Sequence, residues 1–98
     1  MANKNNAAVV KVVALNTLTV ATTVQLSRRC RQLRISLDAG SSDLYIQILG
    51  DVASIGGADS IKIASGTTWE SLAQGNLDID RLSVIASAGI GNATFFGM

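Results

Sequence analysis

The chain has 98 residues, of which 48% are hydrophobic and 15% are charged, and its net charge is +1. This length fits one domain with one core, and the composition is too apolar for a disordered chain. The small net charge excludes a general attraction to nucleic acid or to anionic membranes. The charged fraction is also low for a free monomer, which favours assembly with further copies or with a larger partner.

The first part of the chain is predicted to be an arm or a first strand. Residues 1–6 are polar, and the stretch from Val9 to Leu26 is rich in valine and threonine, which favour a pleated sheet. Alternate positions in this stretch share one face, as is typical of a half-buried strand, and that face carries Leu18, Val20, Thr22 and Val24. We therefore divide the chain into an N-terminal arm or first strand at 1–23 and a sandwich domain at 24–98.

No segment is predicted to span a membrane. The longest run without a charge extends from Val12 to Ser27 and is interrupted by polar side chains. A membrane-spanning helix needs about 20 mostly apolar residues. A membrane is therefore not among the predicted partners.

The clearest alternation lies in the second quarter of the chain. A strand is predicted from Cys30 to Leu37, with Leu33, Ile35 and Leu37 on the face of Arg31. A turn of small and polar residues at 38–43 leads to a second alternating run at 44–49. A short connection between two such runs predicts an antiparallel hairpin.

The remaining strands are short and separated by glycine-containing turns. The loop at 50–59 is predicted to contain a short extended piece at 52–55, and a turn is predicted at 75–80. The predicted strands lie at 60–64, 69–73, 81–86 and 93–97, with one helical turn as the alternative at 69–73. Six to eight short strands with turn signals roughly every 8–12 residues indicate an all-β fold, an antiparallel sandwich or jelly-roll.

A basic cluster is the densest charge feature, and it consists of Arg28, Arg29, Arg31 and Arg34. One interpretation is pairing with carboxylates of the same chain or of a partner, with the arginines covering a strand edge. The other is contact with phosphates of a nucleic acid. No aromatic residues are interleaved for base stacking, so we favour pairing, predict no nucleic-acid partner, and expect the arginine-led strand at 28–37 to be a contact edge.

Candidate catalytic groups are few, and we predict that the chain is not an enzyme. Histidine, the usual proton shuttle, is absent, and no serine stands in a Ser-x-x-Lys spacing. Asp78 and Asp80 share one face of an extended segment, but two carboxylates alone are typical of a turn. The glycine-rich turns are not followed by Lys-Ser or Lys-Thr, so no phosphate loop is indicated, and no cofactor or metal is predicted.

Two further residues, Trp69 and Cys30, are candidates for packing in the core. Trp69 is either a core filler or part of an interaction surface. Cys30 is the single cysteine and is predicted to be a buried small residue.

Several segments together resemble a known class of proteins. Their order is Cys30–Ile35, Asp43–Ile46, a glycine-rich loop, Gly66–Leu72 and Asp80–Gly89. This order is similar to that in small β-sandwich virion proteins of tailed bacteriophages, including capsid decoration (cement) proteins. The resemblance covers residues 24–98, and Trp69 departs from the usual pattern.

The resemblance implies a role in assembly and carries no catalytic residue. We expect a structural virion protein, assembled in the host cytoplasm, that decorates and stabilises a capsid. Its expected partners are its own copies, with a trimer favoured, and the major capsid protein. The alternative is a tail- or fibre-associated module that recognises a sugar or protein on a host surface, with Trp69 and Tyr45 as the binding platform.

Overall fold

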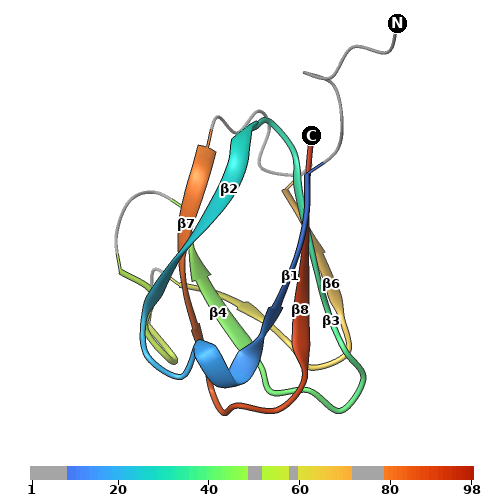
Figure 1. The fold of residues 1–98 in the computed structure, drawn as a ribbon. Helices are drawn as coiled ribbons and strands as arrows, with labels where there is room; N and C mark the ends of the chain where they lie inside the picture. The colour runs from blue at the N-terminus through green and yellow to red at the C-terminus, as the bar shows by residue number, and fades with distance from the viewer. Residues whose placement is uncertain (1–8, 49–51, 58–59, 72–78) are drawn as a thin grey trace, which may run out of the picture.

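A computed structural model describes residues 9–48, 52–57, 60–71 and 79–98. The described residues form eight strands and one turn of 3-10 helix (Figure 1). The elements are β1 (Val9–Ala14), η2 (Leu15–Thr17), β2 (Thr22–Cys30), β3 (Leu33–Leu37), β4 (Leu44–Gln47), β5 (Ile61–Ile63), β6 (Thr68–Glu70), β7 (Ile79–Ala86) and β8 (Asn92–Gly97).

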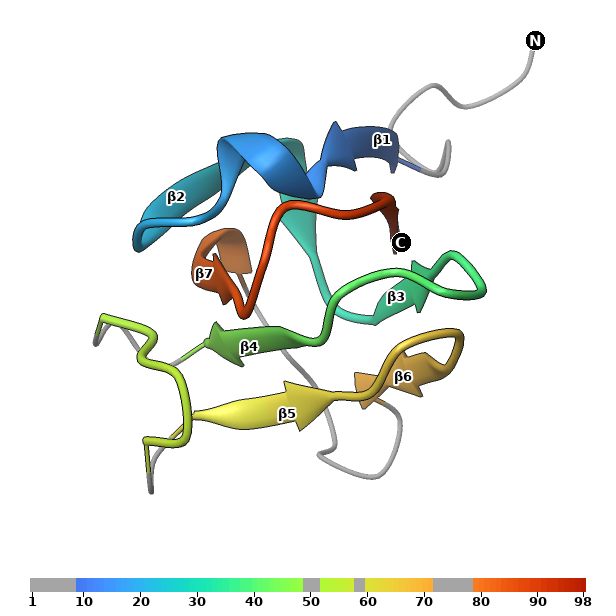
Figure 2. The same cartoon turned by 90° about the horizontal axis from the view of Figure 1, so that it is seen from below.

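The strands form two four-stranded antiparallel sheets. Sheet A has the order β1-β8-β3-β6 and sheet B the order β2-β7-β4-β5, and the end-on view of Figure 2 shows the two layers. The pairs β1·β8, β2·β7, β3·β6 and β4·β5 are nested, as in one long hairpin rolled into two layers. This is the strand arrangement of a jelly-roll. The predicted all-β class is therefore confirmed, and of the predicted sandwich or jelly-roll the chain forms the jelly-roll.

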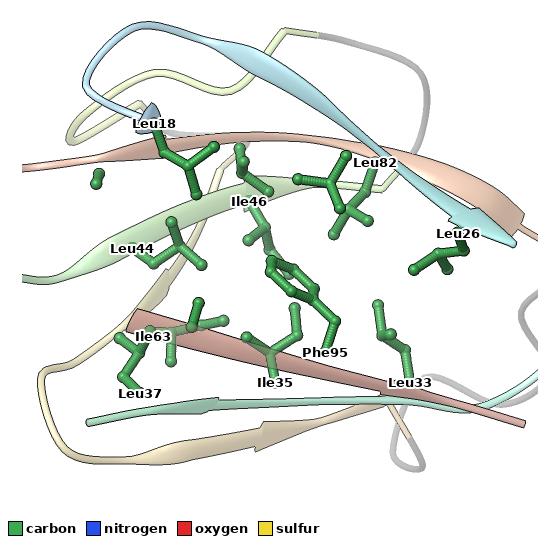
Figure 3. Close-up of a cluster of buried hydrophobic side chains, with 14 of the residues drawn as sticks. Leu18, Leu26, Leu33, Ile35, Leu37, Leu44, Ile46, Ile63, Leu82 and Phe95 are labelled. Atoms are coloured by element: carbon green, nitrogen blue, oxygen red, sulfur yellow. The ribbon is translucent and has the colours of Figure 1, made fainter. Parts of the chain in front are cut away.

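The core lies between the sheets and is built by alternation along each strand. In β3 the buried residues are Leu33, Ile35 and Leu37, and the residues between them face outward. Leu44 and Ile46 of β4 approach from the opposite sheet, and Phe95 of β8 lies in the middle of the layer (Figure 3). Each such fully buried side chain stabilises the fold by about 1.5–3 kcal/mol.

The predicted hairpin between the two clearest alternating runs is wrong. β3 pairs with β8 and β6, whereas β4 pairs with β7 and β5. The turn at 38–43 therefore carries the chain from sheet A to sheet B. Both runs alternate because both point one face into the same core, and alternation does not distinguish strands that pair from strands that face each other.

The valine- and threonine-rich stretch is two strands rather than one. β1 ends at Ala14, and Leu15 and Leu18 turn their side chains into the core at the end of the sandwich. The sequence predicted that Leu18 and Val20 lie on the same face of one strand. This prediction is wrong, because Leu18 is buried and Val20 is 69% exposed. Since β1 belongs to sheet A and β2 begins at Thr22, the predicted boundary at residue 24 falls inside a strand.

The later strands lie close to their predicted positions. β5, β6, β7 and β8 match the runs at 60–64, 69–73, 81–86 and 93–97, although residues 72–73 lie outside the described part of the chain. No strand forms at 52–55. Of the turn predicted at 75–80, residues 75–78 are not described, and Ile79 and Asp80 begin β7 instead.

One end of the sandwich is a network of hydrogen bonds between loops. Ile90 and Ser42 exchange two bonds, because the Ser42 N–H donates to the Ile90 carbonyl (2.9 Å) and the Ile90 N–H donates to Ser42 Oγ (3.1 Å). The N–H of Asn92 donates to Asp38 Oδ2 (3.1 Å). Gly91 has φ +88°, and a Cβ there would lie 2.7 Å from the Cβ of Ser41, so the loops are tightly packed.

Candidate functional site

The predicted arginine cluster does not form one surface. Arg28 and Arg29 belong to β2, an edge strand of sheet B, and Arg34 belongs to β3, an interior strand of sheet A. Arg31 lies in the connection, where its N–H donates to the carbonyl of Met98 (2.7 Å). The predicted strand at 28–37 is thus broken at residues 31–32, and only its first part lies at a sheet edge.

Two of the arginines lie near carboxylates of this chain. The Nε of Arg34 is 3.2 Å from Oε1 of Glu70, which stands opposite it on β6. Partial burial raises the pKa of Asp80, but the hydrogen bond from Arg81 and the charges of Arg81 and Arg29 outweigh it, and the pKa is lowered overall. These pairings agree with the intrachain interpretation of the cluster, and both lie at surfaces where an ion pair adds little to stability.

The two aromatic residues considered as a binding platform lie on different sheets. Trp69 stands opposite Ile35 on the core side of sheet A, where it is partly buried against the core. Tyr45 is half-buried on the outer face of sheet B, opposite Ile85 and Lys62. The structure does not bring these two side chains together.

One part of the outer face of sheet B is in contact with the loop that follows β4. The N–H of Ala53 donates to Oγ of Ser83, which faces outward between the buried Leu82 and Val84 (2.9 Å). Gln47, on the same outer face of β4, is only 4% exposed. Ala53 therefore lies against this part of the sheet, whereas Val52 and Ile55 beside it are exposed.

The outer face of sheet A carries apolar side chains that the described residues leave exposed. Val10 of β1 stands opposite Phe96 of β8, and Val12 opposite Thr94. We define the sheet A face as four residues with these exposures: Val10 59%, Val12 62%, Phe96 38% and Met98 59%. Farther across the sheet, Arg34 stands opposite Phe96 and pairs with Glu70, so the apolar half of the face is bordered by a neutralised charge pair.

A second apolar surface lies at the loop-rich end of the sandwich. We call it the loop end, and it consists of Val20 (69% exposed) and Ile90 (62% exposed). The loops that carry them are joined, because the N–H of Leu15 donates to the Gly91 carbonyl (2.9 Å) and the N–H of Ala86 donates to the Leu18 carbonyl (2.8 Å). The backbone bonds thus fix the loops that carry these two exposed side chains, and Figure 1 shows the loops side by side at this end of the sandwich.

Neither surface was predicted from the sequence, although the sequence contains a signal for the sheet A face. In β1 valines occupy both parities, and β8 contains adjacent phenylalanines, so one apolar residue of each pair must face outward. The signal was incomplete because the patch joins Val10 to Phe96, and only the strand pairing shows that they are neighbours.

Cys30 is fully buried; burial raises the pKa of its thiol from 9.0, and the charge of Arg28 only partly opposes this shift. Among the residues described, no group of three or more histidine, cysteine, aspartate or glutamate side chains could hold a metal ion. None of the described helical residues forms a helix long and apolar enough to cross a membrane.

Comparisons of the chain with protein-family models, with curated proteins and with solved structures give no match. The function must therefore be inferred from the residues and the geometry of this chain.

Proposed function

We propose that this chain is a non-enzymatic structural protein of a bacteriophage virion, which binds the capsid shell and its own copies and so stabilises the particle. In this proposal the chain is assembled in the host cytoplasm and its second partner is the major capsid protein. The observation that carries the proposal is the presence of two separate apolar surfaces, the sheet A face and the loop end, on a chain of net charge +1.

Two partners require two surfaces, and the fold supplies them at different places. The sheet A face lies on the broad side of the sandwich, whereas the loop end lies at its tip. Exposed apolar residues that gather on a rigid surface mark sites of protein contact. Jelly-rolls are also among the folds of viral capsid domains, although the same fold serves other functions, so the fold supports the proposal without carrying it.

The alternative, a tail- or fibre-associated binding module, receives less support. Its platform needs exposed aromatic rings, and Trp69 packs against the core while Tyr45 lies on the other sheet. We therefore retain the virion role as the proposed function.

The test is binding to particles that lack the chain. Purified chain is mixed with virions of a phage whose gene for the chain has been deleted, and the virions are pelleted through sucrose. We expect wild-type chain in the pellet at a saturating, reproducible number of copies per particle. A chain that never pellets with these virions contradicts the proposal.

A matched set of variants shows which surface binds the shell. Ile90→Thr and Val20→Thr remove apolar contact at the loop end, whereas Val52→Thr changes an equally exposed valine on another loop (72%). We expect the first two to reduce the bound fraction and Val52→Thr to leave it unchanged.

A further inference from the structure

We propose that the sheet A face is a self-association surface, on which a second copy of the chain packs face to face through β1 and β8. This inference rests on the proposed assembly function, since it assigns one of the two apolar surfaces to one of the two partners. It leaves the loop end as the surface for the shell.

The edge strands of both sheets disfavour association by strand pairing between chains, which is the other common way in which β-proteins associate. An exposed edge strand can pair with a strand of another chain, and proteins prevent this with short strands, bulges and inward-pointing charges. Here the edge strands β5 and β6 have three residues each, and β2 has a register shift between Gln25 and Cys30. In β1, Lys11 has core-facing parity and its Nζ donates to the carbonyl of Gln25 on β2 (3.1 Å).

All four described edges are thus protected, while one face is left apolar. That combination directs association to the face. On the outer side of sheet A the apolar residues occupy β1 and β8, and the ion pair of Arg34 with Glu70 occupies β3 and β6.

The distribution of charge selects a second copy packed about a twofold axis. With the axis parallel to the strands and between β1 and β8, Val10 of each copy meets Phe96 of the other, as an isologous contact requires. The charged residues then lie outside the contact and keep their own partners. An axis along β3 would instead place Arg34 of one copy against Arg34 of the other, which is unfavourable.

The area of the face sets the strength of the contact. Only β1 and β8 meet their copies, and two strands about 4.8 Å apart, with six residues each at about 3.4 Å per residue, present roughly 200 Å² of sheet per copy. Two copies would bury roughly 400 Å², well below the about 1,200 Å² of a stable specific interface. The self-association is therefore weak in dilute solution, and it becomes effective where neighbouring copies are held close together on a particle.

The experiment is sedimentation velocity on the purified chain, without particles. We expect the weight-average sedimentation coefficient to rise as the concentration increases from about 10 μM to about 1 mM, the range expected for a small contact. Because the contact is apolar, added NaCl should not weaken it. A chain that stays monomeric over this range overturns the inference.

Variants locate the contact. Val12→Thr and Phe96→Thr keep residues with high β-propensity at exposed strand positions, and circular dichroism verifies that each folds. We expect either variant to shift association to at least several-fold higher concentration, and Val52→Thr to associate like the wild type. Association that Val12→Thr and Phe96→Thr leave unchanged overturns the assignment to this face.

Disulfide trapping tests the orientation of the copies. Chains carrying Val10→Cys are mixed with chains carrying Phe96→Cys and oxidised; Cys30 is buried and contributes little background. We expect mixed dimers to form faster than either self-dimer, whereas equal rates contradict the axis between β1 and β8.

The two proposals fail in different ways. A monomeric chain that still pellets with virions overturns the self-association and leaves the virion role intact. A chain that associates through the sheet A face but never pellets contradicts the virion role alone.

Discussion

Gly97 of β8 packs directly against Cys30 of β2, and this contact joins the two sheets. A Cβ added at Gly97 would overlap the Sγ of Cys30 and would lie 3.2 Å from its Cβ. Both residues are buried. The thiol thus occupies the space that a side chain at position 97 would need, which gives the lone cysteine a packing role.

We expect Gly97→Ala to lower the free energy of unfolding by about 1–3 kcal/mol, the usual cost of overpacking a core. Urea unfolding measures the effect. In the background of Cys30→Ala the same substitution should cost less, because the overlapping sulfur is gone, and the double-mutant cycle reports this coupling. Strictly additive effects would mean that the two residues do not share this space.

Adjacent phenylalanines should respond differently to truncation. Phe95 is fully buried in the middle of the core, whereas Phe96 is 38% exposed on the sheet A face. We expect Phe95→Ala to cost about 3–5 kcal/mol and Phe96→Ala to cost roughly 1 kcal/mol or less. Thermal and urea unfolding of both variants provide the comparison, and equal losses would contradict the register of β8.

The positions of several strands could be predicted from the sequence, but their pairing could not. Alternation located β3, β4 and β7 because each buries one face, and it predicted the fold class. It did not give the pairing, since Leu37 and Leu44 point into one core from opposite sheets. It also missed the break after Ala14, where no glycine or proline marks the turn and where Leu15 and Leu18 are buried without being in a strand.

The candidate surfaces were less predictable than the strands. Residues of the arginine cluster are close in sequence, yet the break after Cys30 distributes them over two sheets. Val10 and Phe96 are far apart in sequence, yet they are cross-strand neighbours. In both cases the position of a side chain on a surface depends on long-range pairing, which no local pattern encodes.

Lys11 should protect the β1 edge from aggregation. Its side chain has the parity of the core face and bonds to the Gln25 carbonyl, so another strand cannot pair there without covering a charge. We expect Lys11→Val to increase light scattering during storage at constant concentration. Lys11→Arg retains the charge and serves as the control; similar scattering from both variants would contradict this role.

The reactivity of Cys30 should report unfolding. Because burial raises the pKa of the thiol, the folded chain holds its proton at a pH where the unfolded chain forms thiolate. Stability from this group is complete below pH 9.0 and is lost as pH rises from there toward the folded pKa. We expect iodoacetamide to modify the native chain far more slowly than the chain in urea, and Cys30→Ala to lose less stability above pH 9.0 than the wild type does.

The virion role is tested most directly by an electron cryo-microscopy reconstruction of purified virions from a phage that encodes this chain. We expect density for an eight-stranded jelly-roll at symmetry-related positions on the head, with the loop end against the shell and the sheet A face against a neighbouring copy. Virions whose density is fully explained without this chain would contradict the proposed function.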